Sequence, residues 1–146
     1  MLAFFGEARV IVFERPIRFD EVDPAGIVFF ARYANFAHEA VETFFEDLEG
    51  GYPGLIQKRR VGLPIVRYEA EFRAPLRYGD RLRVETSCEK LGKTSATFMH
   101  EIKNAATLEL CAVLRQVVVT VALDAFRPTP MPPDVRAKLE AHRTHV

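Results

Sequence analysis

The wide apolar face of one predicted helix constrains the fold of this chain most strongly. The helix is expected to begin near Phe30, because apolar residues then recur every three or four positions, as on one helical face. That face comprises Tyr33, Phe36, Ala37, Ala40, Val41, Phe44, Phe45 and Leu48. Gly50-Gly51 is expected to end the helix. A face of this width, with four aromatic side chains, is expected to pack against something large and flat, such as a β-sheet.

The strands of such a sheet are predicted mainly in the second half of the chain. In residues 66–73 apolar and charged side chains alternate strictly, as in a strand with one buried face. Further strands are predicted from Leu82, at Thr94 to Ile102 and at Leu108 to Leu123, and one precedes the helix at Ala8 to Ile17. Short turns between the late strands favour antiparallel pairing. The order therefore predicts an α+β domain with one long helix on a five-stranded antiparallel sheet.

The length and charge of the chain limit the classes of protein to consider. Its 146 residues suit one domain, residues 1–146, and not two. Lys+Arg and Asp+Glu both number 20, and this zero net charge favours neither nucleic acid nor membrane partners. The two cysteines lie far apart and match no metal-binding spacing, so no metal or cofactor is expected. The N-terminus lacks the features of a signal peptide and no segment approaches the roughly 20 apolar residues of a membrane span. These features predict a cytoplasmic protein.

A carboxylate within an apolar loop is the main chemical feature of the sequence. Asp23 stands in the stretch VDPAGIVFF, residues 22–30, just before the predicted helix. In apolar surroundings its charged form would be poorly solvated, as in many nucleophiles and general bases. The first N–H groups of a helix have no intrahelical partner and can stabilise negative charge on a carbonyl oxygen. Together these features suggest acyl-transfer chemistry, although an Asp-Pro pair can also be only a turn.

Two stretches of the chain resemble a known family. Residues 19–36, with the pattern Phe-x3-Asp-Pro-Ala-Gly-Ile-Val-Phe-Phe-x2-Tyr-x2-Phe, resemble the signature of the 4-hydroxybenzoyl-CoA thioesterase family of hot-dog fold proteins. Residues 61–66, VGLPIV, are similar to a second stretch of that family. The resemblance extends over roughly Arg9 to Ala125, and the predicted order of elements matches the hot-dog fold. It implies hydrolysis of an aromatic, 4-hydroxybenzoyl-like acyl-CoA to the free acid and CoA in the cytoplasm.

The resemblance also implies roles for individual residues. Asp23 would be the catalytic carboxylate, either as a nucleophile that forms a mixed anhydride or as a general base acting on water. The backbone N–H of Phe30 would bind the thioester carbonyl oxygen. Hot-dog enzymes work as homodimers, often paired into homotetramers, with active sites at the dimer interface. Asp23 of one subunit would then face a substrate-binding segment of its partner, formed by Gly62, Leu63, Pro64, Ile65 and Val66. Ordinary strand packing is the alternative role for the apolar members of that segment.

Three further positions are predicted from the family pattern. His38 stands where relatives commonly carry an acidic residue, so it is expected either to meet a polar group of the acyl moiety or to lie in the subunit interface. Lys90 and Lys93 are predicted to bind the phosphates of CoA, because they match loosely a basic stretch used by relatives. Glu39 is interpreted as part of a solvated helix face.

Other functions fit the same fold. One is hydrolysis of short-chain aliphatic acyl-CoA, as by thioesterases encoded with the Tol-Pal envelope system. Another is non-hydrolytic binding of acyl-CoA, which would leave Asp23 without a chemical purpose. A hydratase would use a histidine beside an acid, and the loop of residues 19–29 contains no histidine.

Overall fold

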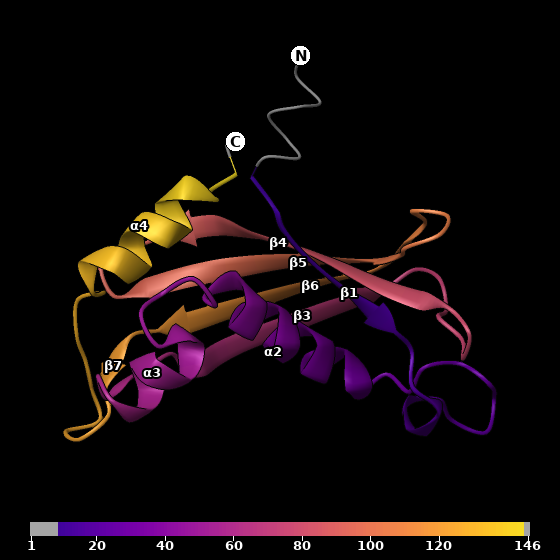
Figure 1. Cartoon of the computed structure of the whole chain (residues 1–146), viewed down its shortest axis with the longest axis horizontal. Helices are drawn as coiled ribbons and strands as arrows, with labels where there is room; N and C mark the ends of the chain where they lie inside the picture. Colours follow the sequence, from indigo (N-terminus) through magenta and orange to yellow (C-terminus); the bar gives the residue numbers. More distant parts are fainter. Residues whose placement is uncertain (1–8, 145–146) are drawn as a thin grey trace, which may run out of the picture.

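One helix lies across one face of a five-stranded antiparallel sheet (Figure 1). The computed structural model describes residues 9–144, so Ala8, where the first strand was predicted to begin, lies outside the described residues. A one-turn 3₁₀ helix, η1 (Phe19–Glu21), precedes the central helix α2 (Arg32–Phe44). Across the sheet, neighbouring strands lie in the order β1 (Ile11–Pro16), β4 (Arg81–Leu91), β5 (Ser95–Asn104), β6 (Leu110–Val119) and β3 (Ile65–Phe72). This is the α+β arrangement of the hot-dog fold.

The central helix is shorter than the sequence pattern predicted. α2 spans 13 residues, and a separate helix, α3 (Gly51–Gln57), begins at the glycine pair that was expected to end helical structure. Gly50 has a φ of 75°, a conformation that glycine adopts without a Cβ clash, so the chain changes direction there and a second helix follows. Among residues 9–144, no helix combines the length and apolar character needed to cross a bilayer. The cytoplasmic location stays a prediction.

The strand predicted from Leu108 to Leu123 is divided between two sheets. It breaks at Thr120, whose N–H donates to the Thr94 carbonyl at 2.7 Å and whose carbonyl accepts the Thr129 N–H at 2.9 Å. The chain then leaves the main sheet and enters a second, three-stranded sheet formed by β2 (Val61–Gly62), β7 (Val121–Ala122) and β8 (Arg127–Pro128). A final helix, α4 (Pro133–Ala141), packs near β4.

The apolar face of α2 is buried against the sheet, as its periodicity predicted. Phe36, Ala37 and Phe44 are fully buried, and the first two belong to a core cluster with Val84 and Leu114 of the sheet. Burial of one large apolar side chain stabilises a fold by about 1.5–3 kcal/mol. The position of α2, and of the loop before it, is therefore determined mainly by this packing.

A chain of polar side chains crosses the buried face of the sheet beneath the helix. The His100 ring lies between Thr86 on β4 and Gln116 on β6, at 2.8 Å from Thr86 Oγ1 to Nδ1 and 2.9 Å from Gln116 Oε1 to Nε2. All three side chains are buried. Burial lowers the pKa of His100 to about 4, so its ring is neutral at pH 7.

Candidate active site

Asp23 opens a tight turn in the loop before α2. Its carbonyl accepts the Gly26 N–H at 2.8 Å, and its own N–H donates to the Ile27 carbonyl at 2.9 Å. Pro24 at the second position and Gly26, with a φ of 82°, suit such a turn. Asp23 Oδ1 accepts the Ala25 N–H at 2.8 Å. The side chain is therefore a turn residue, and its Oδ2 has no hydrogen-bond donor in the described part of the chain.

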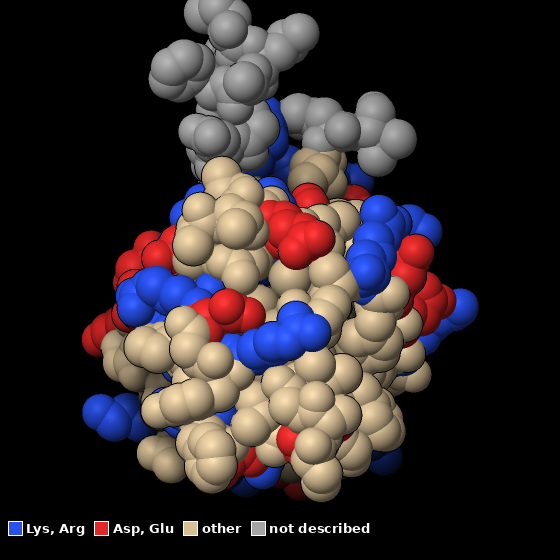
Figure 2. Space-filling model, turned by 90° about the vertical axis from the view of Figure 1, so that its right-hand side faces the viewer, with Lys and Arg blue, Asp and Glu red and all other residues tan. Residues whose placement is uncertain are grey.

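The half-buried Asp23 lines a cavity of about 570 Å³. This volume lies in the usual range for small-molecule sites, roughly 300–1,000 Å³. The walls come from the loop, the start of α2 and the end of β3, and they are mainly apolar, including Ile27, Phe29, Phe30, Tyr33, Phe72 and Pro75. Figure 2 views the end of the molecule that carries this loop, where uncharged side chains cover much of the lower surface between scattered charged ones.

The helix begins two residues later than predicted, so Phe30 lies in a turn just before it. The Arg32 N–H donates to the Phe29 carbonyl at 2.9 Å, and the Tyr33 N–H donates to the Phe30 carbonyl at 3.3 Å. Within residues 9–144 the N–H groups of Phe30 and Ala31 have no acceptor, and no side chain caps α2. These amides lie at the positive end of the helix dipole, so a carbonyl oxygen beside them would be stabilised.

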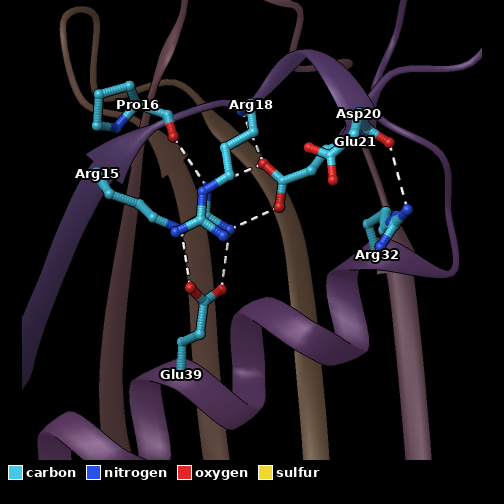
Figure 3. Close-up of polar contacts among 7 residues, drawn as sticks. All are labelled: Arg15, Pro16, Arg18, Asp20, Glu21, Arg32 and Glu39. Atoms are coloured by element: carbon cyan, nitrogen blue, oxygen red, sulfur yellow. Dashed lines mark hydrogen bonds and ion pairs between the residues drawn. The ribbon is translucent and has the colours of Figure 1, made fainter.

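An arginine of β1 ties the loop to α2 (Figure 3). Arg15 donates to both carboxylate oxygens of Glu21, at 2.9 and 2.6 Å, and to both of Glu39, at 2.9 Å each. Glu21 stands two residues before Asp23, and its carbonyl accepts the Phe29 N–H at 2.9 Å. The Arg15–Glu21 ion pair therefore holds the residue at which the two ends of the loop are joined. The interpretation of Glu39 as a solvated residue is wrong, because its carboxylate is occupied by Arg15.

The charges of this cluster are coupled. Burial acts to raise the pKa of Glu21, but hydrogen bonds from the Arg15 guanidinium and the Arg18 N–H outweigh it, and the pKa lies below its usual value. The two carboxylates in turn raise the pKa of Arg15 despite its burial. Glu21 and Arg15 are therefore both charged at neutral pH.

Half of the predicted substrate-binding residues line a second cavity, and none of them lines the Asp23 cavity of the same subunit. His38, Leu63 and Ile65 line this cavity, which has a volume of about 120 Å³. The remaining members of the predicted segment lie nearby in sequence but outside its walls: Gly62 buried in β2, Pro64 half-buried between strands, and Val66 exposed on β3.

The cations at the Asp23 cavity differ from those predicted. Arg73 and Arg77 line it, and residue 77 pairs with Ile27 through an isolated β-bridge. Lys90 lies in a separate hollow, and Lys93 is exposed in the turn between β4 and β5. Sequence reasoning missed the two arginines because only the folded chain brings the end of β3 to the loop.

A helix on a five-stranded antiparallel sheet is the arrangement of the hot-dog fold, and in this chain Asp23 and residues at the start of that helix line one cavity. Residues 17–139 match the family model described as the thioesterase-like superfamily, and the chain therefore belongs to that superfamily.

Individual relatives agree with this assignment. The 1,4-dihydroxy-2-naphthoyl-CoA hydrolase of Nostoc punctiforme is 26% identical over 131 residues, which cover 90% of this chain and 87% of the relative. The crystal structure of a thioesterase superfamily protein from Jannaschia sp. CCS1 is 28% identical, with a TM-score of 0.85 over 93% of this chain and 94% of that one. A gentisyl-coenzyme A thioesterase is also 28% identical, with a TM-score of 0.77 over 89% of this chain and 99% of that one.

Proposed function

We propose that the protein hydrolyses the CoA thioester of a hydroxylated aromatic acid to the free acid and CoA. The observation that carries this proposal is that one mainly apolar cavity is lined by both Asp23 and Phe30, whose N–H has no acceptor within residues 9–144. Two similar proteins are named for 1,4-dihydroxy-2-naphthoyl-CoA and gentisyl-CoA, which are aromatic acyl thioesters. The 4-hydroxybenzoyl group that the sequence motif implies belongs to the same chemical class.

Asp23 and the amides before α2 would divide the chemistry between them. Asp23 either attacks the thioester carbon, which expels the CoA thiolate and leaves a mixed anhydride for water to cleave, or removes a proton from the attacking water. In both routes water supplies the hydroxyl of the acid and the proton of the thiol. The negative charge on the carbonyl oxygen would be stabilised by the N–H groups of Phe30 and Ala31, and one such donor contributes about 3 kcal/mol.

The phosphates of CoA require cations near the mouth of this cavity. Arg73 and Arg77 are exposed at its wall, and guanidinium groups bind phosphate oxygens in pairs. We assign the CoA phosphates first to these two arginines. Lys90 and Lys93 would take part only if a partner subunit brings them to the site.

A second copy of the chain would complete the site. Within residues 9–144 β3 is an edge strand that pairs only with β6, and all eight of its residues are exposed. Its exposed apolar side chains include Ile65, Val66, Tyr68 and Phe72, and such an edge is normally covered in a native protein. We propose that two β3 strands pair antiparallel. The Phe72 end of one strand, beside Asp23, then lies toward the Ile65 end of the other.

Light scattering after gel filtration is expected to give at least twice the 16.6 kDa chain mass. A Val66→Asp variant should reduce that mass, because it places a charge on the edge that would be covered. Val12→Asp is the matched control on β1, the opposite edge of the sheet, where Val12 is also exposed. A monomeric wild-type protein would contradict the proposed pairing.

Thiol release from a panel of thioesters tests the substrate class. We expect kcat/KM for 1,4-dihydroxy-2-naphthoyl-CoA and 4-hydroxybenzoyl-CoA to exceed that for butyryl-CoA by about 100-fold, because burial of a ring adds about 3 kcal/mol over a short chain. A preference for butyryl-CoA would favour the aliphatic alternative. Calorimetric binding of a non-hydrolysable analogue without thiol release from any thioester would favour the non-hydrolytic one.

A further inference from the structure

The second cavity has one polar wall that the proposed chemistry does not use. Gln116 of β6 lines it and is only 3% exposed. Its Oε1 accepts from His100, whereas its NH₂ group has no acceptor within residues 9–144. Within residues 9–144, Thr120 Oγ1 is the only side-chain nitrogen or oxygen that is both fully buried and without a hydrogen-bond partner. The Gln116 amide nitrogen also has no partner, so it is not fully buried and part of its surface is accessible. A ligand that covers this group must supply a hydrogen-bond partner, because a polar group that is buried without one costs about 1–3 kcal/mol.

The hydrogen-bonded chain leaves one end of the Gln116 carboxamide for the cavity. With Gln116 Oε1 as the acceptor, the single N–H of the neutral His100 ring lies on Nε2, and Nδ1 accepts from the Thr86 hydroxyl. The chain is equally complete in the reverse sense, with the Gln116 NH₂ donating to Nε2 and the Nδ1–H donating to Thr86 Oγ1. In either sense the free end of the amide is a polar group that meets the cavity.

The size and walls of the cavity suit one aromatic ring. Its volume of about 120 Å³ approaches the roughly 150 Å³ of an apolar cavity that binds benzene. Tyr52, Tyr68 and Phe98 contribute aromatic surface. In the proposed dimer, the end of β3 that borders this cavity lies toward Asp23 of the partner subunit, so a ring attached to the reacting carbonyl would point into it.

We propose that Gln116 is a specificity-determining residue whose amide forms a hydrogen bond with a hydroxyl group on the acyl ring bound in this cavity. The inference rests on the proposed function and names the group that selects a hydroxylated ring over an unsubstituted one. His38 lines the same cavity, but its side chain is 61% exposed and lies 3.7 Å from Glu42, so it lies toward solvent.

The test compares 4-hydroxybenzoyl-CoA with benzoyl-CoA in wild-type and variant proteins. Gln116→Met keeps a similar volume and removes the donors. We expect kcat/KM for 4-hydroxybenzoyl-CoA to fall about 10-fold or more, because its hydroxyl loses a partner, while benzoyl-CoA changes less than about 3-fold. Gln116→Leu also removes the amide, so it decides the question if Gln116→Met does not fold. It should lower kcat/KM for 4-hydroxybenzoyl-CoA relative to benzoyl-CoA in the same direction.

The outcomes separate this inference from the proposed function. Equal losses for both substrates, or an unchanged ratio in an active protein, would overturn the role of Gln116 and leave thioester hydrolysis intact. Absence of thiol release from every thioester would overturn the proposed function, and this inference with it. Gln57→Met is the matched control, because Gln57 is exposed on α3 and lines neither cavity, and its ratio should stay near the wild-type value.

Discussion

An Asp23→Asn variant is expected to fold normally and to lose thioester hydrolysis by about 10³-fold. Asparagine keeps the oxygen that accepts the Ala25 N–H, so the turn of residues 23–26 should persist. It lacks the negative charge, and it can neither attack a thioester carbon nor remove a proton from water efficiently. Thiol-release assays at saturating substrate measure the loss, and thermal unfolding followed by circular dichroism measures the fold.

Asp20→Asn provides the matched control. Asp20 lies three residues earlier in the same loop and is exposed, and within residues 9–144 only its carbonyl accepts a side-chain hydrogen bond, from Arg32 (Figure 3). Its activity should stay within about twofold of wild type, because a surface substitution of this kind has little effect. Retained activity in Asp23→Asn would refute a catalytic role. A matching loss of activity and thermal stability in that variant would instead identify Asp23 as only a turn residue.

Most strands were predictable because they have one buried face and the pleat alternates side chains between faces, and β3 keeps this alternation although all eight of its residues are exposed. The ends of the helices and strands were not predictable, because they depend on the backbone conformation of single residues. The positive φ of Gly50 allows a second helix to start where glycines normally signal an end. Thr120 stands between apolar residues on both sides, so the pattern gives no sign that the chain changes sheets there.

The part of the candidate cavity that comes from one continuous segment could be anticipated from the sequence, and the parts that come from distant segments could not. Asp23 and Phe30 belong to one continuous motif, and both line the same cavity. Glu39 has the spacing of an exposed helix residue, and only the folded chain shows its pairing with Arg15. The position of Gln116 could have been predicted from the sequence. It is spaced two residues from Leu114 and from Val118, both buried, so the period of the strand places it on the inner face of the sheet.

Replacing Arg15 by methionine is expected to lower the free energy of unfolding by about 3 kcal/mol. The substitution leaves the buried Glu21 carboxylate without its cation, and breaking a buried ion pair by removing one partner typically costs about 3–5 kcal/mol. The lower end of this energy range applies because the Glu39 side chain, the second partner of Arg15, is 27% exposed and can be solvated. Urea unfolding at pH 7 measures the change. Arg18→Met, at an exposed position of the same segment, should change stability by less than about 0.5 kcal/mol.

Acid pH should reduce the difference between wild type and Arg15→Met. The pKa of Glu21 is lowered in the folded wild type, so the stability contributed by its charged form is present above the unfolded value near 4.5 and is lost as pH falls through the folded value. In the variant the Arg15 hydrogen bonds are lost and the Arg18 N–H remains to oppose burial, so the pKa of Glu21 in the folded state lies higher than in the wild type and acid removes less stability. The gap in unfolding free energy should therefore narrow below pH 4.5. A gap that stays constant with pH would show that Arg15 stabilises the loop through packing against Phe36, 5.2 Å from its guanidinium, and not through Glu21.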